Sequence, residues 1–234
     1  MDSGRKFVGL VVAAGSGSRF GGEVPKQYRL IRGRPVVYHS IFALSSNPYI
    51  SKVNVVLAPD DMLFGSFNWG QLDSLVIPLY VGGASRAESV KKGLLAMSCR
   101  GQDWVIVHDG ARPCLSKNDL DEMLHCTSKT NNGVVLGRRV SDTIKKGDSS
   151  HNRIVKTISR NDLWCALTPQ IFEYDLLKRA LSDQLTPDIT DESSAVEKIG
   201  VNPVLIESKH ANPKITFNDD LALAESILKN RENP

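Results

Sequence analysis

The chain has 234 residues, of which 41% are hydrophobic and 24% charged, with a formal net charge of +3. This composition is typical of a folded globular protein, and the length fits a single domain. Basic and acidic residues are interspersed, so nucleic-acid binding is not indicated, and no apolar stretch approaches the roughly 20 residues of a membrane span. The four cysteines lack a C-x-x-C spacing or a metal-ligand pattern with the histidines, which indicates reduced thiols and a cytoplasmic protein.

Short apolar runs alternate with helical segments through the first half of the chain. We expect strands at 7–14, 52–58, 75–81 and 104–108, and helices at 35–45 and 85–97. This alternation predicts an α/β protein with an open, Rossmann-like and mostly parallel sheet flanked by helices. Ligands of such sheets bind beyond the carboxyl ends of the strands, so the loops after these strands are candidate sites.

The pattern changes after Val134. Two polar strands are expected at 140–146 and 153–159, joined by the turn G-D-S-S-H-N. This hairpin has little apolar surface of its own, so residues 137–160 are expected to form a β-arm that packs on a second subunit. Further helices are expected at 171–182, at 190–199 with Thr190 as N-cap, and at 219–229, with strands at 201–207 and 214–217. Residues 1–234 are thus expected to form one domain with a protruding arm.

A glycine-rich loop, A-A-G-S-G-S-R-F-G-G-E-V-P-K-Q-Y, follows the first expected strand. It is not a dinucleotide fingerprint, because Phe20 stands where the third glycine is needed, and Pro25 interrupts any helix. It is not a Walker A loop either, because Glu23 stands where lysine is needed. Two familiar nucleotide loops are therefore excluded.

The remaining interpretation is a nest of backbone N–H groups. Gly15 and Gly17 allow these groups to approach an anion closely, and Arg19 and Lys26 add two positive charges. A triphosphate is the expected ligand. The alternative is a plain surface turn, which has the same composition.

Two later loops have the same character. G-G-A-S-R at 82–86 precedes a helix, whose N-terminal amides favour anions, and H-D-G-A-R-P at 108–113 places Asp109 at a strand end beside Arg112. A carboxylate in a phosphate site usually holds Mg²⁺ or a ligand hydroxyl. Three such loops at one sheet edge favour a binding site over three unrelated turns.

Motifs in a fixed order then identify a family. They are A-A-G-x-G-x-R at 13–19, P-K-Q-Y at 25–28, G-G-x-x-R-x-x-S-V at 82–90, H-D-G-A-R-P at 108–113, V-x-D-T-I-K at 140–145, L-T-P-Q at 167–170, T-D-E at 190–192 and K-I-T at 214–216. Over nearly its whole length the chain resembles the 2-C-methyl-D-erythritol 4-phosphate cytidylyltransferases of non-mevalonate isoprenoid biosynthesis. The resemblance implies a nucleotidyltransferase fold, CTP and a polyol phosphate as substrates, Mg²⁺ as cofactor and a homodimer.

The resemblance also implies the roles of individual residues. Nucleotide binding is carried over to Ala13, Ala14, Gly15, Gly17, Gly83, Arg86 and Ser89. Substrate binding is carried over to Asp109, Gly110, Arg112, Thr143, Thr168 and Thr190. Catalytic roles are carried over to Arg19, Lys26, Arg160 and Lys214. Thr143 and Arg160 would reach the substrate phosphate from the partner's arm, and Mg²⁺ would be held mainly by the CTP phosphates, with Asp109 as a candidate protein ligand.

The expected chemistry needs no general base. A phosphate monoester has a second pKa near 6 and is already an anion at neutral pH, so catalysis would consist of positioning and charge neutralisation. His108 is therefore expected to be structural. Two alternatives stay open: a cytidylyltransferase for another polyol phosphate such as ribitol 5-phosphate, whose relatives tend to show A-G-G and H-D-S-x-R-P, and a non-catalytic nucleotide-binding protein.

Overall fold

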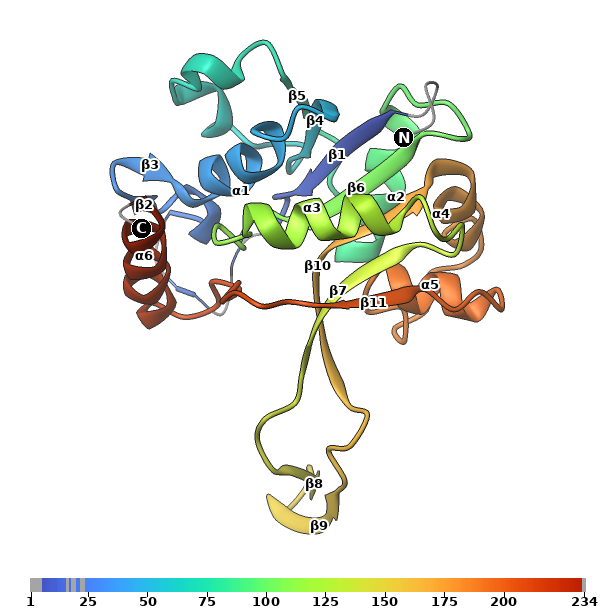
Figure 1. Cartoon of the computed structure of the whole chain (residues 1–234). Coiled ribbons are helices and arrows are strands. Elements are labelled where there is room, and N and C mark those ends of the chain that lie inside the picture. Colours follow the sequence, from blue (N-terminus) through green and yellow to red (C-terminus); the bar gives the residue numbers. More distant parts are fainter. Residues whose placement is uncertain (1–5, 16, 18–19, 22–23, 233–234) are drawn as a thin grey trace.

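A seven-stranded sheet forms the centre of the molecule in a computed structural model that describes residues 6–15, 17, 20–21 and 24–232 (Figure 1). The strand order is β11-β7-β10-β6-β1-β4-β5. The strands are β1 (Phe7–Val12), β4 (Ile50–Val56), β5 (Val76–Leu79), β6 (Trp104–Asp109), β7 (Val134–Arg139), β10 (Trp164–Glu173) and β11 (Val204–Glu207). β10 runs antiparallel to both of its neighbours, and the other pairs are parallel. The mostly parallel sheet is confirmed.

Helices cover both faces of this sheet. α1 (Val36–Ser45) and α3 (Lys117–Cys126) pack on one face, and α2 (Arg86–Ala96), α4 (Tyr174–Ala180) and α5 (Glu192–Lys198) pack on the other. Consecutive side chains of β1 alternate between the two cores: Val11 joins the α1 and α3 side, and Leu10 the α2 side. A strand buried on both faces must be apolar throughout, which explains the uninterrupted run F-V-G-L-V-V.

The C-terminal helix α6 (Asp219–Glu232) lies at one end of the sheet (Figure 1). It contacts the small hairpin β2 (Leu30–Ile31) and β3 (Arg34–Pro35) and closes a third core around Ile215 and Cys114. Short 3-10 turns lie at 26–28, 64–66 and 70–72. No helix among the described residues is long and apolar enough to cross a membrane.

The expected arm is present as a hairpin that projects from the sheet (Figure 1). β8 (Ile144–Asp148) pairs antiparallel with β9 (Arg153–Ile158), and these two strands form a separate sheet. Ile154 and Val155 on β9 are 67% and 61% exposed. The arm therefore presents apolar side chains without covering them itself.

Three expectations were wrong, and strands β7 and β10 of the central sheet were not predicted. The helix expected at 171–182 begins only at Tyr174, because Ile171 and Phe172 complete β10 and are fully buried in the sheet. The strand expected at 214–217 does not form: Ile215 N–H donates to the Ala111 carbonyl (2.8 Å), and these residues pair with no strand. Asp191, not Thr190, caps α5, since its side chain accepts from Ser194 N–H in a capping box. Helix α3 was not predicted.

Candidate active site

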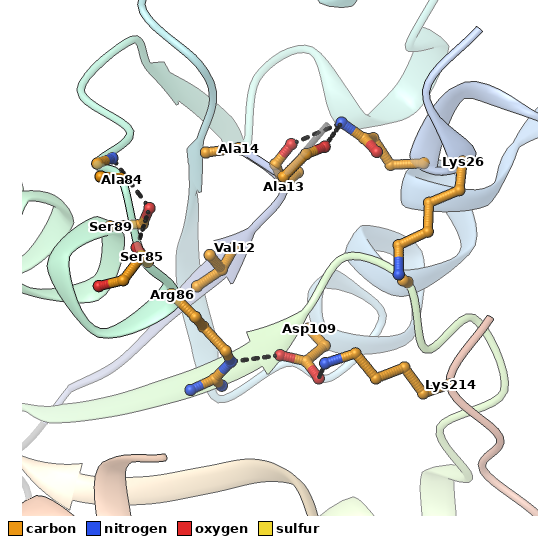
Figure 2. Close-up of a pocket in the computed structure, with 14 residues that line it drawn as sticks. Val12, Ala13, Ala14, Lys26, Ala84, Ser85, Arg86, Ser89, Asp109 and Lys214 are labelled. Atoms are coloured by element: carbon orange, nitrogen blue, oxygen red, sulfur yellow. Dashed lines mark hydrogen bonds and ion pairs between the residues drawn. The ribbon is translucent and has the colours of Figure 1, made fainter. Parts of the chain in front are cut away.

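A pocket of about 380 Å³ opens at the carboxyl ends of β1 and β6 (Figure 2). This is the place that the rule for parallel sheets predicts. It is lined by residues of all three predicted loops and of the segment before α6, namely Val12, Ala13, Ala14, Gly15, Lys26, Gln27, Gly83, Ala84, Ser85, Arg86, Ser89, Asp109, Ala111 and Lys214. Segments far apart in the sequence thus meet in one cavity.

The first loop is fixed by a residue that the sequence analysis did not select. Gln27 is buried, and its side-chain amide donates to the carbonyl oxygens of Ala13 (2.9 Å) and Gly15 (3.0 Å). Gly17 has φ +71, where a side chain would be strained, and a Cβ there would lie 3.3 Å from Lys26 N. The motif P-K-Q-Y therefore folds back on the glycine turn and holds its shape. The motif itself was the signal that could have identified Gln27.

The second loop is fixed by hydrogen bonds at the start of α2. Ser85 caps the helix by accepting from Glu88 N–H, and the Ser89 hydroxyl accepts from Gly83 N–H (3.0 Å) and donates to the Ser85 carbonyl (2.9 Å). A Cβ on Gly82 would lie 2.8 Å from the Leu57 carbonyl oxygen and would collide with Ala14. The absent side chain lets the second loop lie against the first, which shapes one wall of the pocket.

A charged network forms the opposite wall. Asp109, at the end of β6, contacts Arg86 (2.8 Å), Lys214 (2.8 Å) and Arg112 (3.4 Å), and Arg86 also makes a bidentate pair with Glu192 (2.7 and 3.1 Å). Both carboxylates are buried. Such fork-shaped pairs fix the guanidinium in one orientation.

Asp109 and Arg86 stay ionised at neutral pH. Burial by itself would raise the pKa of Asp109, but the cations of Arg86, Lys214 and Arg112 outweigh it and hold that pKa well below its ordinary value. Burial opposes the charge of Arg86, yet Glu192 and Asp109 raise the pKa of Arg86 above its ordinary value. With Lys26 on the other side of the pocket, cations outnumber carboxylates, so the cavity favours an anionic ligand.

His108 lies in the core beneath this network. It is fully buried, and burial lowers the pKa of its imidazole to about 4. Its Nε2 lies 3.0 Å from the Arg112 carbonyl, which can only accept, so Nε2 carries the proton and Nδ1 accepts from the Thr168 hydroxyl (3.1 Å). Thr168 Oγ1 in turn accepts from Asp109 N–H (3.0 Å). The neutral histidine orients Asp109 through Thr168, in agreement with the expected structural role.

The remaining predicted residues lie outside the pocket lining. Gly110 forms the tight turn after β6, where a Cβ would lie 3.1 Å from the Val12 carbonyl, and Thr190 lies just before α5. Thr143 and Arg160 belong to the arm, where Arg160 donates to the Ser141 carbonyl. Arg19 lies outside the described residues. Glu192, within the T-D-E motif, was missed as the partner of Arg86.

The described residues do not fit a metal ion held by protein side chains. They contain no group of three or more His, Cys, Asp or Glu residues placed to bind one. The carboxylate of Asp109 is already engaged by three cations.

A glycine-rich loop after the first strand of a mostly parallel sheet, with Lys26, Arg86 and Lys214 in one pocket beside it, fits a nucleotidyltransferase. The family model for 2-C-methyl-D-erythritol 4-phosphate cytidylyltransferase matches residues 7–230. The chain belongs to this family.

The sequences and structures of relatives match this chain over nearly their whole length. A 2-C-methyl-D-erythritol 4-phosphate cytidylyltransferase of Chromobacterium violaceum is 46% identical over 226 residues, covering 97% of this chain and 99% of the relative. One from Dechloromonas aromatica is 45% identical, covering 95% and 97%. Among solved structures, the Francisella tularensis enzyme has a TM-score of 0.81 at 30% identity, covering 95% of this chain and 99% of the other. A crystal structure of a 4-diphosphocytidyl-2C-methyl-D-erythritol synthase has a TM-score of 0.83 at 32% identity, covering 96% and 99%.

Proposed function

We propose that the chain transfers the cytidylyl group of CTP to 2-C-methyl-D-erythritol 4-phosphate. The products are 4-diphosphocytidyl-2-C-methyl-D-erythritol and pyrophosphate, in the non-mevalonate route to isoprenoids. Membership of the family supports the reaction. The single structural observation that carries it is the meeting of Lys26, Asp109 and Lys214 in one pocket beside the glycine loop.

The reaction joins two anions. An oxygen of the substrate phosphate attacks the α-phosphorus of CTP, a new P–O bond forms there, and the bond to the β-phosphate oxygen breaks to release pyrophosphate. The attacking group is already ionised near neutral pH, so no proton needs to be removed. Buried, neutral His108 lies beneath the pocket wall rather than in it, which suits a mechanism without a general base.

The cations of the pocket are proposed to bind different substrates. Lys26 follows the glycine loop and is proposed to face the triphosphate and the leaving pyrophosphate; its ammonium donates to the Ile215 carbonyl (2.9 Å). Lys214 is on the side of Asp109, where the polyol phosphate would bind. Arg19 is proposed to join Lys26. Fixed cations that match charge as it develops are the main source of catalysis in phosphoryl-type transfers.

Cytosine would be read mainly by backbone groups. Ala13 and Ala14 follow β1 and line the pocket, and Ser89 lies on the α2 side of it (Figure 2). Gly83 also lines the pocket. Both walls are pinned by internal hydrogen bonds, so they offer a slot that needs no rearrangement. Asp109, Gly110, Arg112, Thr168 and Thr190 are proposed to shape the site for the polyol.

A homodimer is part of the proposal. The arm, which includes Thr143 and Arg160, projects away from the pocket of its own chain. Its exposed apolar side chains Ile154 and Val155 would be buried by a second subunit. A second copy would supply that cover and would receive Arg160 at its phosphate site. Mg²⁺ would enter with the CTP phosphates and screen their charge, and the four free thiols suit a cytoplasmic location.

Pyrophosphate release tests the function. The purified protein is assayed with each of the four nucleoside triphosphates, and with methylerythritol phosphate or ribitol 5-phosphate as acceptor. We expect turnover with CTP and methylerythritol phosphate. Release with ribitol 5-phosphate alone would favour the other polyol, and CTP binding without turnover on any acceptor would favour a non-catalytic nucleotide-binding protein.

A further inference from the structure

Lys214 is delivered to the pocket by an irregular segment. Residues 208–216 connect β11 to α6 and form neither helix nor strand. Figure 1 shows this connection passing alongside α3. An irregular segment has no ladder of hydrogen bonds to fix it, so its path depends on individual contacts. The position of the Lys214 ammonium therefore depends on what holds these residues.

The end of the segment nearest the pocket is held by the site itself. Asn212 donates from its side chain to the Thr168 carbonyl (2.9 Å), and its own carbonyl accepts from Arg112 (2.8 Å). Ile215 N–H donates to the Ala111 carbonyl, and the Ile215 carbonyl accepts from Lys26. These contacts use groups that the substrates would also approach.

The other end is held from outside the pocket. Ser208 N–H donates to the Gly137 carbonyl (2.7 Å), Arg231 donates to the Ala211 carbonyl (2.9 Å), and one buried carboxylate binds three consecutive residues. Asp119 on α3 is 1% exposed, and its two oxygens face the segment. One lies 2.9 Å from the Ser208 hydroxyl, and the other lies 3.3 Å from Lys209 N and 3.2 Å from His210 Nδ1. Three consecutive residues of the segment thus bind one side chain.

The helix gives this carboxylate a rigid base. Ser116 caps α3, Asp119 lies in its first turn, and Leu120 and Met123 are buried against the sheet. A carboxylate in the first turn is also favoured by the helix dipole. Burying a carboxylate is costly unless its partners compensate, and the partners here that lie beyond its own helix all belong to residues 208–210. An apolar side chain could fill the same space, but it could not fix those residues.

We propose that Asp119 is a positioning residue for the polyol-phosphate half of the reaction. It fixes residues 208–210. Lys214, four residues beyond His210, is therefore held in the conformation that places its ammonium beside Asp109. The inference rests on the proposed function. The glycine loop and α2 form the cytosine slot without this segment. The segment contacts the nucleotide side through Lys26 at Ile215, which Ala111 also holds, so we expect the larger effect on the polyol phosphate and the smaller one on CTP.

Asp119→Asn and Ser208→Ala test the proposal, with Asp103→Asn as matched control. Asp103 is also a buried carboxylate that accepts backbone N–H groups, from Lys6 (3.3 Å) and Arg100 (2.8 Å), but it lies just before β6, at the opposite edge of the sheet from the pocket. We expect Asp119→Asn to raise the KM for methylerythritol phosphate about tenfold, with the KM for CTP within about twofold, and Ser208→Ala to act in the same direction more weakly. The control Asp103→Asn should lower the melting temperature and leave the KM values for methylerythritol phosphate and for CTP unchanged.

Hydrogen exchange provides a readout that needs no substrate. The backbone amides in 208–214, where Pro213 has none, should exchange faster in Asp119→Asn and at the wild-type rate in Asp103→Asn. Equal rises of both KM values, or exchange unchanged at 208–214, would overturn the proposal. A wild-type protein that releases no pyrophosphate would instead refute the proposed function, while the exchange experiment would still decide whether Asp119 fixes the segment.

Discussion

Lys214 Nζ lies 2.8 Å from Asp109 Oδ2, which joins the segment before α6 to the end of β6. The same carboxylate binds Arg86, which Glu192 holds from α5. The network therefore connects four separate parts of the chain at one wall of the pocket. Its geometry is fixed before a ligand arrives, which lowers the cost of binding an anion there.

Asp109→Asn should remove the group that organises these cations. We expect turnover to fall by at least about a hundredfold and the free energy of unfolding to fall by about 3 kcal/mol, because Arg86 and Arg112 lose a buried counter-charge. Steady-state kinetics and urea unfolding measure the two effects. The exposed pair of Asp188 and Lys198 (2.6 Å) provides the control, since Asp188→Asn should change neither value noticeably. Full activity of Asp109→Asn would contradict the assigned site.

Stability should depend on pH through His108. Its pKa is about 4 in the folded protein and about 6.5 in the unfolded chain. Below pH 6.5 the unfolded chain binds a proton that the folded protein does not, so stability falls as the pH drops toward 4. We expect a loss of about 2 to 3 kcal/mol across this window. His108→Asn should show a smaller slope between pH 4.5 and 6.5 in urea unfolding, and an identical slope would show that His108 is not the titrating group.

Gln27 should control nucleotide affinity. Gln27→Leu removes two buried hydrogen bonds that fix Ala13 and Gly15, each worth about 1 kcal/mol. We expect CTP to bind about tenfold more weakly in isothermal titration. Asn54→Leu is a matched control, because Asn54 is buried and donates to the Gly9 carbonyl (3.3 Å) outside the pocket. Equal losses in the two variants would attribute the effect to general destabilisation.

The arm should govern oligomeric state. Ile154→Asp places a charge in the exposed apolar surface of β9, and we expect it to convert a dimer to a monomer in light scattering. Met62→Asp changes a still more exposed apolar side chain (85%) on a different part of the surface and should leave the dimer intact. If the wild-type protein is monomeric at every concentration tested, the proposed role of the arm is wrong.

A shared site can be tested by complementation. Lys26→Ala and Arg160→Ala should each be nearly inactive. If Arg160 acts in the partner's pocket, one site of a mixed dimer contains both intact residues, and random mixing should restore about a quarter of wild-type activity. The same mixture would regain nothing if Arg160 serves the pocket of its own chain.

The sequence by itself determined the class of fold and the loops of the site. Uninterrupted apolar runs predict strands buried on both faces, and the glycine and arginine loops after them could be assigned to one sheet edge because parallel strands end there together. These are local signals, so one sequence suffices to find them. The ordered motifs added the family, which the comparisons confirm.

Only the tertiary structure decided which side chains hold the site in place. Gln27, Glu192 and Asp119 act on residues that are distant in sequence. The motifs around Gln27 and Glu192 mark these positions without showing which groups they contact, and Asp119 belongs to no motif. The same limit explains the helix wrongly expected from Ile171, because a short apolar run fits a buried strand as well as a helix. In the structure this run is a strand because it pairs with β6 on one side and β7 on the other. Short sequence motifs identify the groups that contact a substrate. The groups that position them depend on packing between distant parts of the chain.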